Sequence, residues 1–493
     1  MYTSLPLLPL DLLHPILCYL TDNADINACS QVNRTFNFVA IPILYHTLDS
    51  RVISKFFIHH PSVALKSNPA LALHVRCVTE TSAIQNGLLS RYPFIVQNTL
   101  SALALCSNIQ SLTWIDNWTT PNDMLSALLS VVRNLPLQEL TIRTHNYIGE
   151  GTWTELSKNT GLRKLSLWSM SGPKVLHNWS NNLCKTLVQL ELGLTCFSLE
   201  TCLHFLSQCP LLTDLRLKGA PSTSITSILS HLPNLKNLDT EYTLLPSSSS
   251  LFRRAQSAPV HGQSAHNKNV SLLPILQTLT VRTTALDALG PQKLWTWVHN
   301  LVPRRGLQKL KLHSFTLYGC GNMTPSSSSS SLSLPWSGPA AAGTVRLHPG
   351  EVQTQTQTMF PKMFMLELAV AQRDTLKCCD IEGLVLNMSD LETVLGLFPK
   401  LEVLKCAIAC KDVASLLEVF SRVGQELRKL RLVQVQWWTL GSRFTAEDAK
   451  RMMLNSNLRV IQVGSILYTG RCVRDLTGAP TLEVSETVQM NRW

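Results

Sequence analysis

A leucine motif, Leu-x-x-Leu-x-Leu, recurs along most of the chain and limits its fold more than any other feature. Six consecutive copies, spaced by 28, 25, 25, 25 and 23 residues, begin at Ile109, Leu137, Leu162, Leu187, Leu212 and Leu235. Later copies begin at Leu276, Leu307, Met363, Ile381, Leu401, Leu427 and Leu458, and a degenerate early copy begins at Val75. In a strand, positions 4 and 6 of the motif point to the same side. One such strand cannot bury its apolar side alone, whereas many stacked parallel strands share one core.

The segments between these strands have helical spacing. Apolar residues follow it at 125–132, 199–206 and 225–229, and Asp412 is placed to cap a helix over 413–420. A period of about 20–29 residues with this motif is typical of leucine-rich repeats. We therefore predict an α/β solenoid shaped as a horseshoe, with parallel strands on the concave face and helices on the convex face.

Composition is consistent with a large core and a basic surface. Of 493 residues, 45% are hydrophobic and 15% are charged, and the net charge is +11. No apolar run is long enough to span a bilayer, so no membrane contact is expected. The fourteen cysteines contain no CxxC pair, which argues against a zinc site and favours reduced thiols.

Two segments near 246–271 and 319–358 interrupt the repeats. They are rich in serine, glutamine, threonine and alanine and contain few apolar residues. Neither can bury enough surface to offset the entropy of ordering, so both are predicted to be disordered insertions. They are either neutral expansions or regulatory loops that carry phosphorylation sites.

The first 48 residues form a separate apolar segment. Its motifs are, in order, Leu8-Pro9, Ile16-Leu17-x-x-Leu20, Cys29-x-x-Val32-Asn33 and Pro42-x-Leu44-Tyr45. Its apolar positions exceed what so short a segment can bury, which predicts a surface for a partner. Pro15 would remove a hydrogen bond inside a helix, so the first helix either begins there or is kinked there.

Together these motifs resemble an F-box in the form common in fungal proteins, over about residues 5–48. F-boxes followed by leucine-rich repeats form a family of substrate receptors in Skp–cullin–F-box ubiquitin ligases. The resemblance implies an F-box-like helical domain at 1–48, a linker at 49–70 and the solenoid at 71–493. It also implies that the adaptor-binding and packing surface consists of Leu8, Pro9, Leu12, Leu13, Ile16, Leu17 and Leu20.

The resemblance further implies a non-enzymatic, intracellular role in the cytoplasm or nucleus. The F-box would dock on a Skp-type adaptor, and through it on a cullin–RING ligase, while the repeats bind a protein substrate. No HExxH, GxxxxGKS/T or GxSxG motif occurs, so no catalytic residue, metal or cofactor is expected. The alternatives are a repeat scaffold for protein or nucleic acid with no ligase link, an N-terminal segment that merely caps the solenoid, and a hydrolase hidden in an atypical segment.

The outward strand positions 3, 5 and 7 of the motif carry ten basic and five acidic residues. This bias predicts an acidic or phosphorylated protein segment as the ligand, with nucleic acid disfavoured; otherwise the face is simply solvated. The candidate substrate-binding residues are Arg143, Lys164, Trp168, Arg216, Lys218, Arg282, Lys309, Lys311, His313, Lys429 and Arg431. Lys405 is the tenth base of this set.

Overall fold

The computed structural model describes most of the chain. The described residues are 9–49, 61–81, 94–116, 122–144, 148–169, 183–194, 199–220, 222–242, 274–283, 292–303, 305–313, 361–437, 443–474 and 479–488. The chain divides into two units, Met1–Leu279 and Thr280–Trp493, and each is considered separately.

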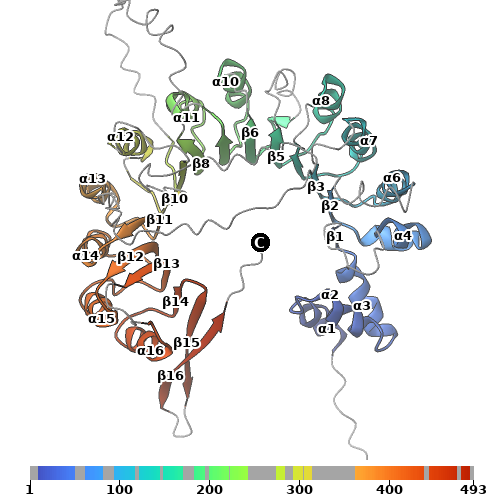
Figure 1. Cartoon of the computed structure of the whole chain (residues 1–493). Coiled ribbons are helices and arrows are strands. Elements are labelled where there is room, and N and C mark those ends of the chain that lie inside the picture. Colours follow the sequence, from blue (N-terminus) through green and yellow to red (C-terminus); the bar gives the residue numbers. More distant parts are fainter. Residues whose placement is uncertain are drawn as a thin grey trace, which may run out of the picture. The chain divides into compact units, whose positions relative to one another are not determined.

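The first unit begins with three short helices, α1 (Leu10–Leu17), α2 (Asn23–Ser30) and α3 (Arg34–Leu44). Side chains cap two of them: Asp22 accepts a hydrogen bond from the amide of Ala24, and Asn33 accepts one from the amide of Phe36, each at 2.9 Å. Pro15 lies inside α1, so the helix begins before it and not at it. The three helices gather at the blue end of the chain in Figure 1.

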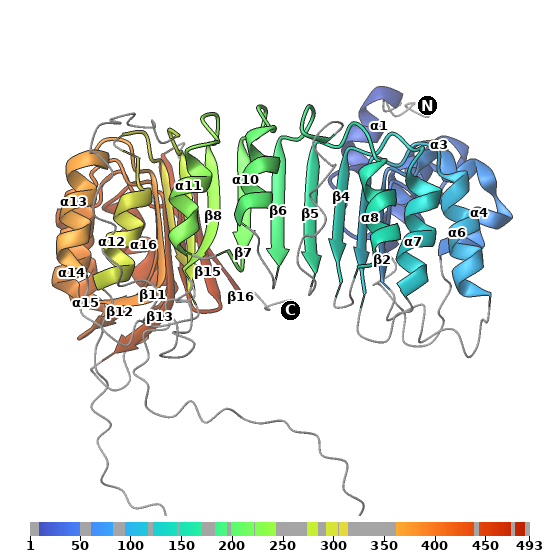
Figure 2. The same ribbon diagram turned by 90° about the horizontal axis from the view of Figure 1, so that it is seen from above.

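The rest of the first unit alternates strands with helices. Its strands are β1 (Thr47–Asp49), β2 (Cys77–Thr81), β3 (Ser111–Ile115), β4 (Glu139–Arg143), β5 (Lys164–Ser169), β6 (Gln189–Leu194), β7 (Asp214–Lys218) and β8 (Asn237–Tyr242), and β9 (Thr278–Thr283) crosses the unit boundary. Its helices are α4 (Pro61–Ser67), η1 (Pro69–His74), α6 (Ile95–Leu105), α7 (Asn122–Val132), α8 (Glu150–Ser157), α10 (Leu199–Ser207), η2 (Ser222–Ser224) and α11 (Ile225–Leu229). Strands β1 to β8 pair in chain order and in parallel, and the helices cover one side of the sheet (Figure 2).

The second unit repeats this arrangement and ends differently. Its helices are α12 (Gln292–Leu301), α13 (Lys362–Gln372), α14 (Met388–Leu397), α15 (Val413–Arg422) and α16 (Ala446–Leu454). Its strands are β10 (Lys309–His313), β11 (Cys378–Leu386), β12 (Val403–Cys410), β13 (Lys429–Trp437), β14 (Val460–Val463), β15 (Ile466–Arg474) and β16 (Pro480–Val488). Strands β10 to β14 are parallel, whereas β14, β15 and β16 pair in antiparallel fashion, an ending that the sequence did not predict.

The leucine positions form the core, as the repeat predicts. Leu162, Leu165 and Leu167 are each 1% exposed, and the equivalent residues of neighbouring repeats are buried too. The predicted cap is also confirmed, because the Asp412 carboxylate accepts a hydrogen bond from the Ser415 amide at 2.8 Å at the start of α15. The chain is thus a leucine-rich-repeat-like α/β solenoid that follows a helical N-terminal domain.

Two predicted repeat copies were wrong. Met363-Leu366-Leu368 lies in helix α13, where Met363 and Leu366 are exposed, because an i, i+3 spacing suits a helix as well as a repeat strand. The strand copy is instead Leu376-Cys379-Ile381, since Cys379 pairs with Leu404 and Ile381 with Cys406. Ile381-Leu384-Leu386, the second wrong copy, therefore begins at the end of the true motif.

The predicted boundaries also change in one place. Of the linker expected at 49–70, residues 61–67 form α4, and β1 already pairs with β2, so the sheet begins before residue 71. The insertions predicted near 246–271 and 319–358 lie outside the described residues.

Candidate functional site

The N-terminal helices have a small core of their own. Leu13 and Leu17 of α1 pack with Ile26 of α2 and Ala40 of α3, and all four are at most 4% exposed. Six partly buried side chains line this cluster: Leu20, Cys29, Phe36, Val39, Ile43 and Leu44. Leu13, Leu17 and Leu20 therefore lie in or against the interior of the domain, on its packing side.

Other apolar side chains of this domain are exposed. Leu12 and Ile16, both predicted adaptor-binding residues, are 49% and 45% exposed. Sequence reasoning missed three more exposed apolar side chains, Leu10 on α1, Tyr19 just after it and Phe38 on α3, which are 65%, 87% and 81% exposed. The i, i+4 spacing of Leu12 and Ile16 places them on one side of α1, next to the side that Leu13 and Leu17 form. Pro9 immediately precedes α1, and Leu8 lies outside the described residues.

A tryptophan lies at the centre of the strand face of the first unit, the side of the sheet away from the helices. Arg143, Trp168, Gly193 and Lys218 are lateral neighbours on β4 to β7. The Trp168 ring lies against Gly193, where an added Cβ would sit 2.8 Å from the ring carbon Cδ2. Three cations lie over the ring: Arg143 at 5.6 Å, Arg216 at 5.4 Å and Lys218 at 4.8 Å from its centroid.

The polar side chains beside this ring form hydrogen bonds and ion pairs with one another. Glu191 accepts hydrogen bonds from the Trp168 indole at 2.8 Å and from the Ser166 hydroxyl at 3.0 Å, and it pairs with Arg216 at 2.9 Å. Arg216 also pairs with Asp239 at 3.3 Å, and Lys164 pairs with Glu139 at 3.7 Å. Each predicted substrate-binding cation of this unit therefore contacts an acid or an aromatic ring: Arg143, Lys164, Arg216 and Lys218. Arg282, on the part of β9 that belongs to the second unit, is half-buried and also has a partner.

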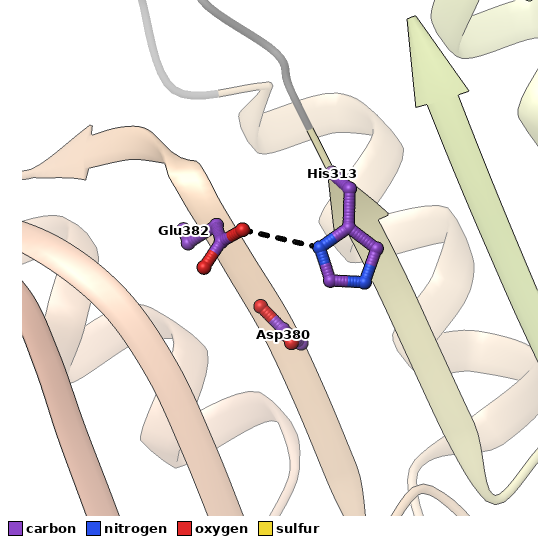
Figure 3. A group of neighbouring side chains, drawn as sticks. All are labelled: His313, Asp380 and Glu382. Carbon is purple, nitrogen blue, oxygen red and sulfur yellow. Dashed lines mark hydrogen bonds and ion pairs between the residues drawn. The ribbon is translucent and has the colours of Figure 1, made fainter. Parts of the chain in front are cut away.

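The strand face of the second unit contains an ion-pair network that the sequence did not predict. The His313 ring on β10 and Glu382 on β11 form a hydrogen bond of 3.2 Å between Nδ1 and Oε1, with Asp380 beside them (Figure 3). The Lys405 ammonium pairs with Asp380 at 3.5 Å and contacts Glu382. Burial raises the pKa of the Glu382 carboxyl, but Lys405 and His313 outweigh that effect and hold the pKa below its ordinary value.

The same side chains offer the atoms of a possible metal site. Ligand atoms of His313, Asp380 and Glu382 lie within 4.8 Å of one another. The Lys405 ammonium, however, already lies against both carboxylates, in the position that a bound cation would need. The arrangement therefore fits an internal ion-pair network better than a metal centre.

Four other predicted bases have a different environment. Lys309 and Lys311 lie on β10, and Lys429 and Arg431 lie on β13. Lys311 is half-buried and the other three are exposed. In the part of the chain that the structure describes, none of these four side chains forms a salt bridge or hydrogen bond.

The misplaced repeat copy explains why the acidic pair was missed. With Leu376 at position 1 of its motif, Asp380 and Glu382 occupy outward positions 5 and 7. The predicted copies at Met363 and Ile381 placed neither acid at an outward position, so neither entered the charge comparison. Recognising Cys379 as a substitute for leucine would have found both.

Among the described residues, no helix is both long and apolar enough to cross a membrane.

Comparison with known proteins identifies the N-terminal region. Residues 5–51 match the F-box-like family. No curated protein matches the chain significantly.

Three solved structures resemble the chain at low identity. The crystal structure of the yeast Rad7 and Elc1 complex is 12% identical, with a TM-score of 0.42, over 88% of this chain and 89% of that one. A TLR13 complex with a single-stranded RNA is 11% identical, with a TM-score of 0.29, over 80% and 41% of the two chains. The Drosophila Toll–Spätzle complex is 12% identical, with a TM-score of 0.31, over 79% and 46%. By the family match and by its own strands and helices, the chain carries an F-box-like domain at its N-terminus, followed by a leucine-rich-repeat-like α/β solenoid.

Proposed function

We propose that this chain is a non-enzymatic substrate receptor of a Skp–cullin–F-box ubiquitin ligase. The F-box-like domain docks on a Skp-type adaptor, which connects it to a cullin–RING ligase, and the repeats bind a protein substrate. The role requires no catalytic residue, because a receptor acts by raising the local concentration of substrate lysines near the conjugating enzyme.

The observation that supports this role is the set of exposed apolar side chains on the N-terminal domain. Its core is complete without Leu12, Ile16, Tyr19 and Phe38, which nevertheless remain apolar and exposed. Exposed apolar patches of this kind mark surfaces for protein partners. A segment that only capped the solenoid would have no need of these exposed apolar side chains.

The cysteines support a reducing compartment, the cytoplasm or the nucleus. The described cysteines of the repeats, among them Cys184 and Cys209, are mostly buried among apolar side chains, where cysteine packs as a small hydrophobic residue. Cysteines of this kind that are not arranged as a disulfide framework are typical of intracellular proteins.

Adaptor co-purification tests the proposal. Leu12→Glu combined with Ile16→Glu places two charges on the exposed face and leaves the Leu13–Leu17 core intact, so we expect recovery of a co-expressed Skp-type adaptor to fall at least about tenfold. Phe38→Glu, on α3, should weaken recovery in the same direction. The matched control is Val370→Glu on α13, an equally apolar residue that is 91% exposed and far along the chain.

The alternative is a repeat scaffold with no ligase link. It predicts that wild type recovers no adaptor, or that the Leu12 and Ile16 substitutions change recovery no more than Val370→Glu does. Either result would refute the receptor role.

A further inference from the structure

The four bases of the second unit that form no salt bridge with a described residue lie two on each of two strands, Lys309 and Lys311 on β10 and Lys429 and Arg431 on β13. In the strand register, Lys309 is aligned with Cys378, Val403 and Lys429, and Lys311 is aligned with Asp380, Lys405 and Arg431. Each pair therefore occupies the same two lateral rows, one pair on β10 and the other on β13. The strands β11 and β12 lie between them.

The spacing of these pairs follows from sheet geometry. Two residues of one pair, on the same face of a strand, lie about 6.6 Å apart along it, which lets both side chains reach one ligand group. The two pairs are three strands apart, or about 14 Å. An extended peptide advances about 3.3–3.6 Å per residue, so a segment that crosses the sheet covers this distance in about four residues.

The strands between the two pairs offer no anion site. The Lys405 ammonium is occupied by Asp380 and Glu382, whose carboxylates would repel a further anion. Cys378 and Val403, in the other row, are half-buried and uncharged. The middle of a ligand that bridges the two pairs is therefore expected to be uncharged.

The positive charge of this face extends to its neighbours. Burial and the charge of Asp380 raise the pKa of the Cys378 thiol, and Lys311, Lys309 and Lys405 act in the opposite direction. The inserted sequences provide little compensating charge: residues 243–273 contain no acid, and residues 314–360 contain one, Glu351. These two segments therefore carry too little negative charge to neutralise the four bases.

We propose that this surface binds an extended peptide with two phosphorylated side chains about four residues apart and an uncharged stretch between them. Each phosphate presents three acceptor oxygens to two cationic side chains, and Arg431 can bind one through two parallel hydrogen bonds. This inference rests on the proposed receptor function and names the substrate class for it.

The test is fluorescence anisotropy with the full chain, co-purified with the adaptor. The probes are labelled Ser/Ala peptides that carry two phosphoserines four residues apart, the same two phosphoserines one or eight residues apart, one phosphoserine, two glutamates in place of phosphoserines, or none. We expect the four-residue spacing to bind tightest, at least about tenfold tighter than the single phosphoserine, with all phosphopeptide binding weakened by salt. The glutamate peptide should bind more weakly than the doubly phosphorylated one.

Variants locate the site. The double variant Lys429→Ala, Arg431→Ala should bind the doubly phosphorylated peptide only as tightly as wild type binds the singly phosphorylated one. The double variant Lys309→Ala, Lys311→Ala should show the same loss of affinity. The matched control is Arg373→Ala with Lys400→Ala, which removes two exposed charges of the same unit that lie in turns away from the strand face. Circular dichroism checks that each variant is folded. The two double variants change different strands, so if one of them fails to fold, the other still tests the site.

Three outcomes would overturn the inference: no preference for the four-residue spacing, equal binding by the strand variants and the control, or tighter binding of single-stranded RNA than of the phosphopeptide. Adaptor recovery distinguishes a failure of this inference from a failure of the proposed receptor role. If the strand variants retain the adaptor and the peptides do not bind, only the substrate class is wrong, whereas if wild type recovers no adaptor, the receptor role fails whatever the peptides do.

Discussion

The strand faces of the two units carry similar basic residues with different partners. In the first unit, Arg216 is held between Glu191 and Asp239, and Arg143 and Lys218 lie over Trp168. In the second unit, Lys405 is enclosed by Asp380 and Glu382, whereas the bases on β10 and β13 form no salt bridge with any described residue. A count of charges along the sequence would treat the two faces as equivalent. The difference shows that the pairing of these bases depends on which charges lie side by side across strands.

This comparison also separates two kinds of basic residue. A cation that is already paired and half-buried stabilises its own sheet, and its removal should lower the melting temperature. An open cation contributes little to folding, and its removal should affect ligand binding alone. The following substitutions test that distinction.

Glu191→Ala should have the largest effect. It removes the acceptor of the Trp168 and Ser166 hydrogen bonds and one partner of Arg216, so we expect a loss of about 2–3 kcal/mol of stability. Thermal unfolding by circular dichroism measures it. The control is Glu139→Ala, whose carboxylate pairs with Lys164 at the exposed surface. Equal destabilisation by the two substitutions would remove the distinction between enclosed and exposed acids.

Gly193→Ala should be the next largest. The new methyl group would sit 2.8 Å from Cδ2 of Trp168 and displace the ring from its cations, at a cost of about 1–3 kcal/mol. Near-ultraviolet circular dichroism should report the displaced tryptophan. Gly151→Ala in α8, where nothing lies within 4 Å, should leave stability unchanged or raise it. An unaltered tryptophan signal in Gly193→Ala would contradict the stacking.

Glu382→Gln tests the network of the second unit through pH. The pKa of Glu382 is lower in the folded chain than its ordinary value of 4.5. Its ionised form therefore stabilises the fold above about pH 4.5, and this contribution is lost as the pH falls through the folded pKa. At pH 7 the free energy of unfolding of the variant should be about 1 kcal/mol lower than that of wild type, which thermal unfolding would show as a lower melting temperature. The difference in stability should shrink below pH 4.5. Glu402→Gln, at the Lys377 pair, is the control. A difference that is constant with pH would rule out the electrostatic account.

Lys164→Met should have the smallest effect. Lys164 and Glu139 are 42% and 48% exposed, and exposed pairs contribute at most about 0.5 kcal/mol, less at high salt. Urea unfolding at two salt concentrations measures it. A loss as large as that of Glu191→Ala would show that exposure does not separate the two classes of charge.

Much of the fold could be predicted because its signal is local and repeated. The leucine spacing placed the strands β3 to β8 and β12 to β14, and Asp412 marked the start of α15. The F-box-like motifs located the N-terminal domain, since their apolar residues are close together in the chain. The prediction failed at Met363 and Ile381, where a helix also satisfies the leucine spacing and Cys379 replaces the leucine that would mark the strand.

The candidate sites were less predictable because they depend on lateral contacts. The residues predicted to bind an adaptor, taken from a linear motif, divide into a buried and an exposed set only when α1 packs on α2 and α3. His313 and Glu382 are 69 residues apart, with the second inserted segment between them, yet they share a hydrogen bond. No local pattern reports that two such positions become neighbours.

The amino-acid sequence by itself determined the α/β solenoid, the N-terminal domain and the identity of the outward-facing bases. Hydrophobic periodicity carries this information, because each repeat buries the same positions whatever its neighbours are. Tertiary structure alone decided which bases are paired and which are open. Ion pairs form between side chains a few ångströms apart, and that distance is set by the register of adjacent strands. Register placed Glu191 beside Arg216 and Asp380 beside Lys405, and left Lys429 and Arg431 without a salt bridge to any residue that the structure describes.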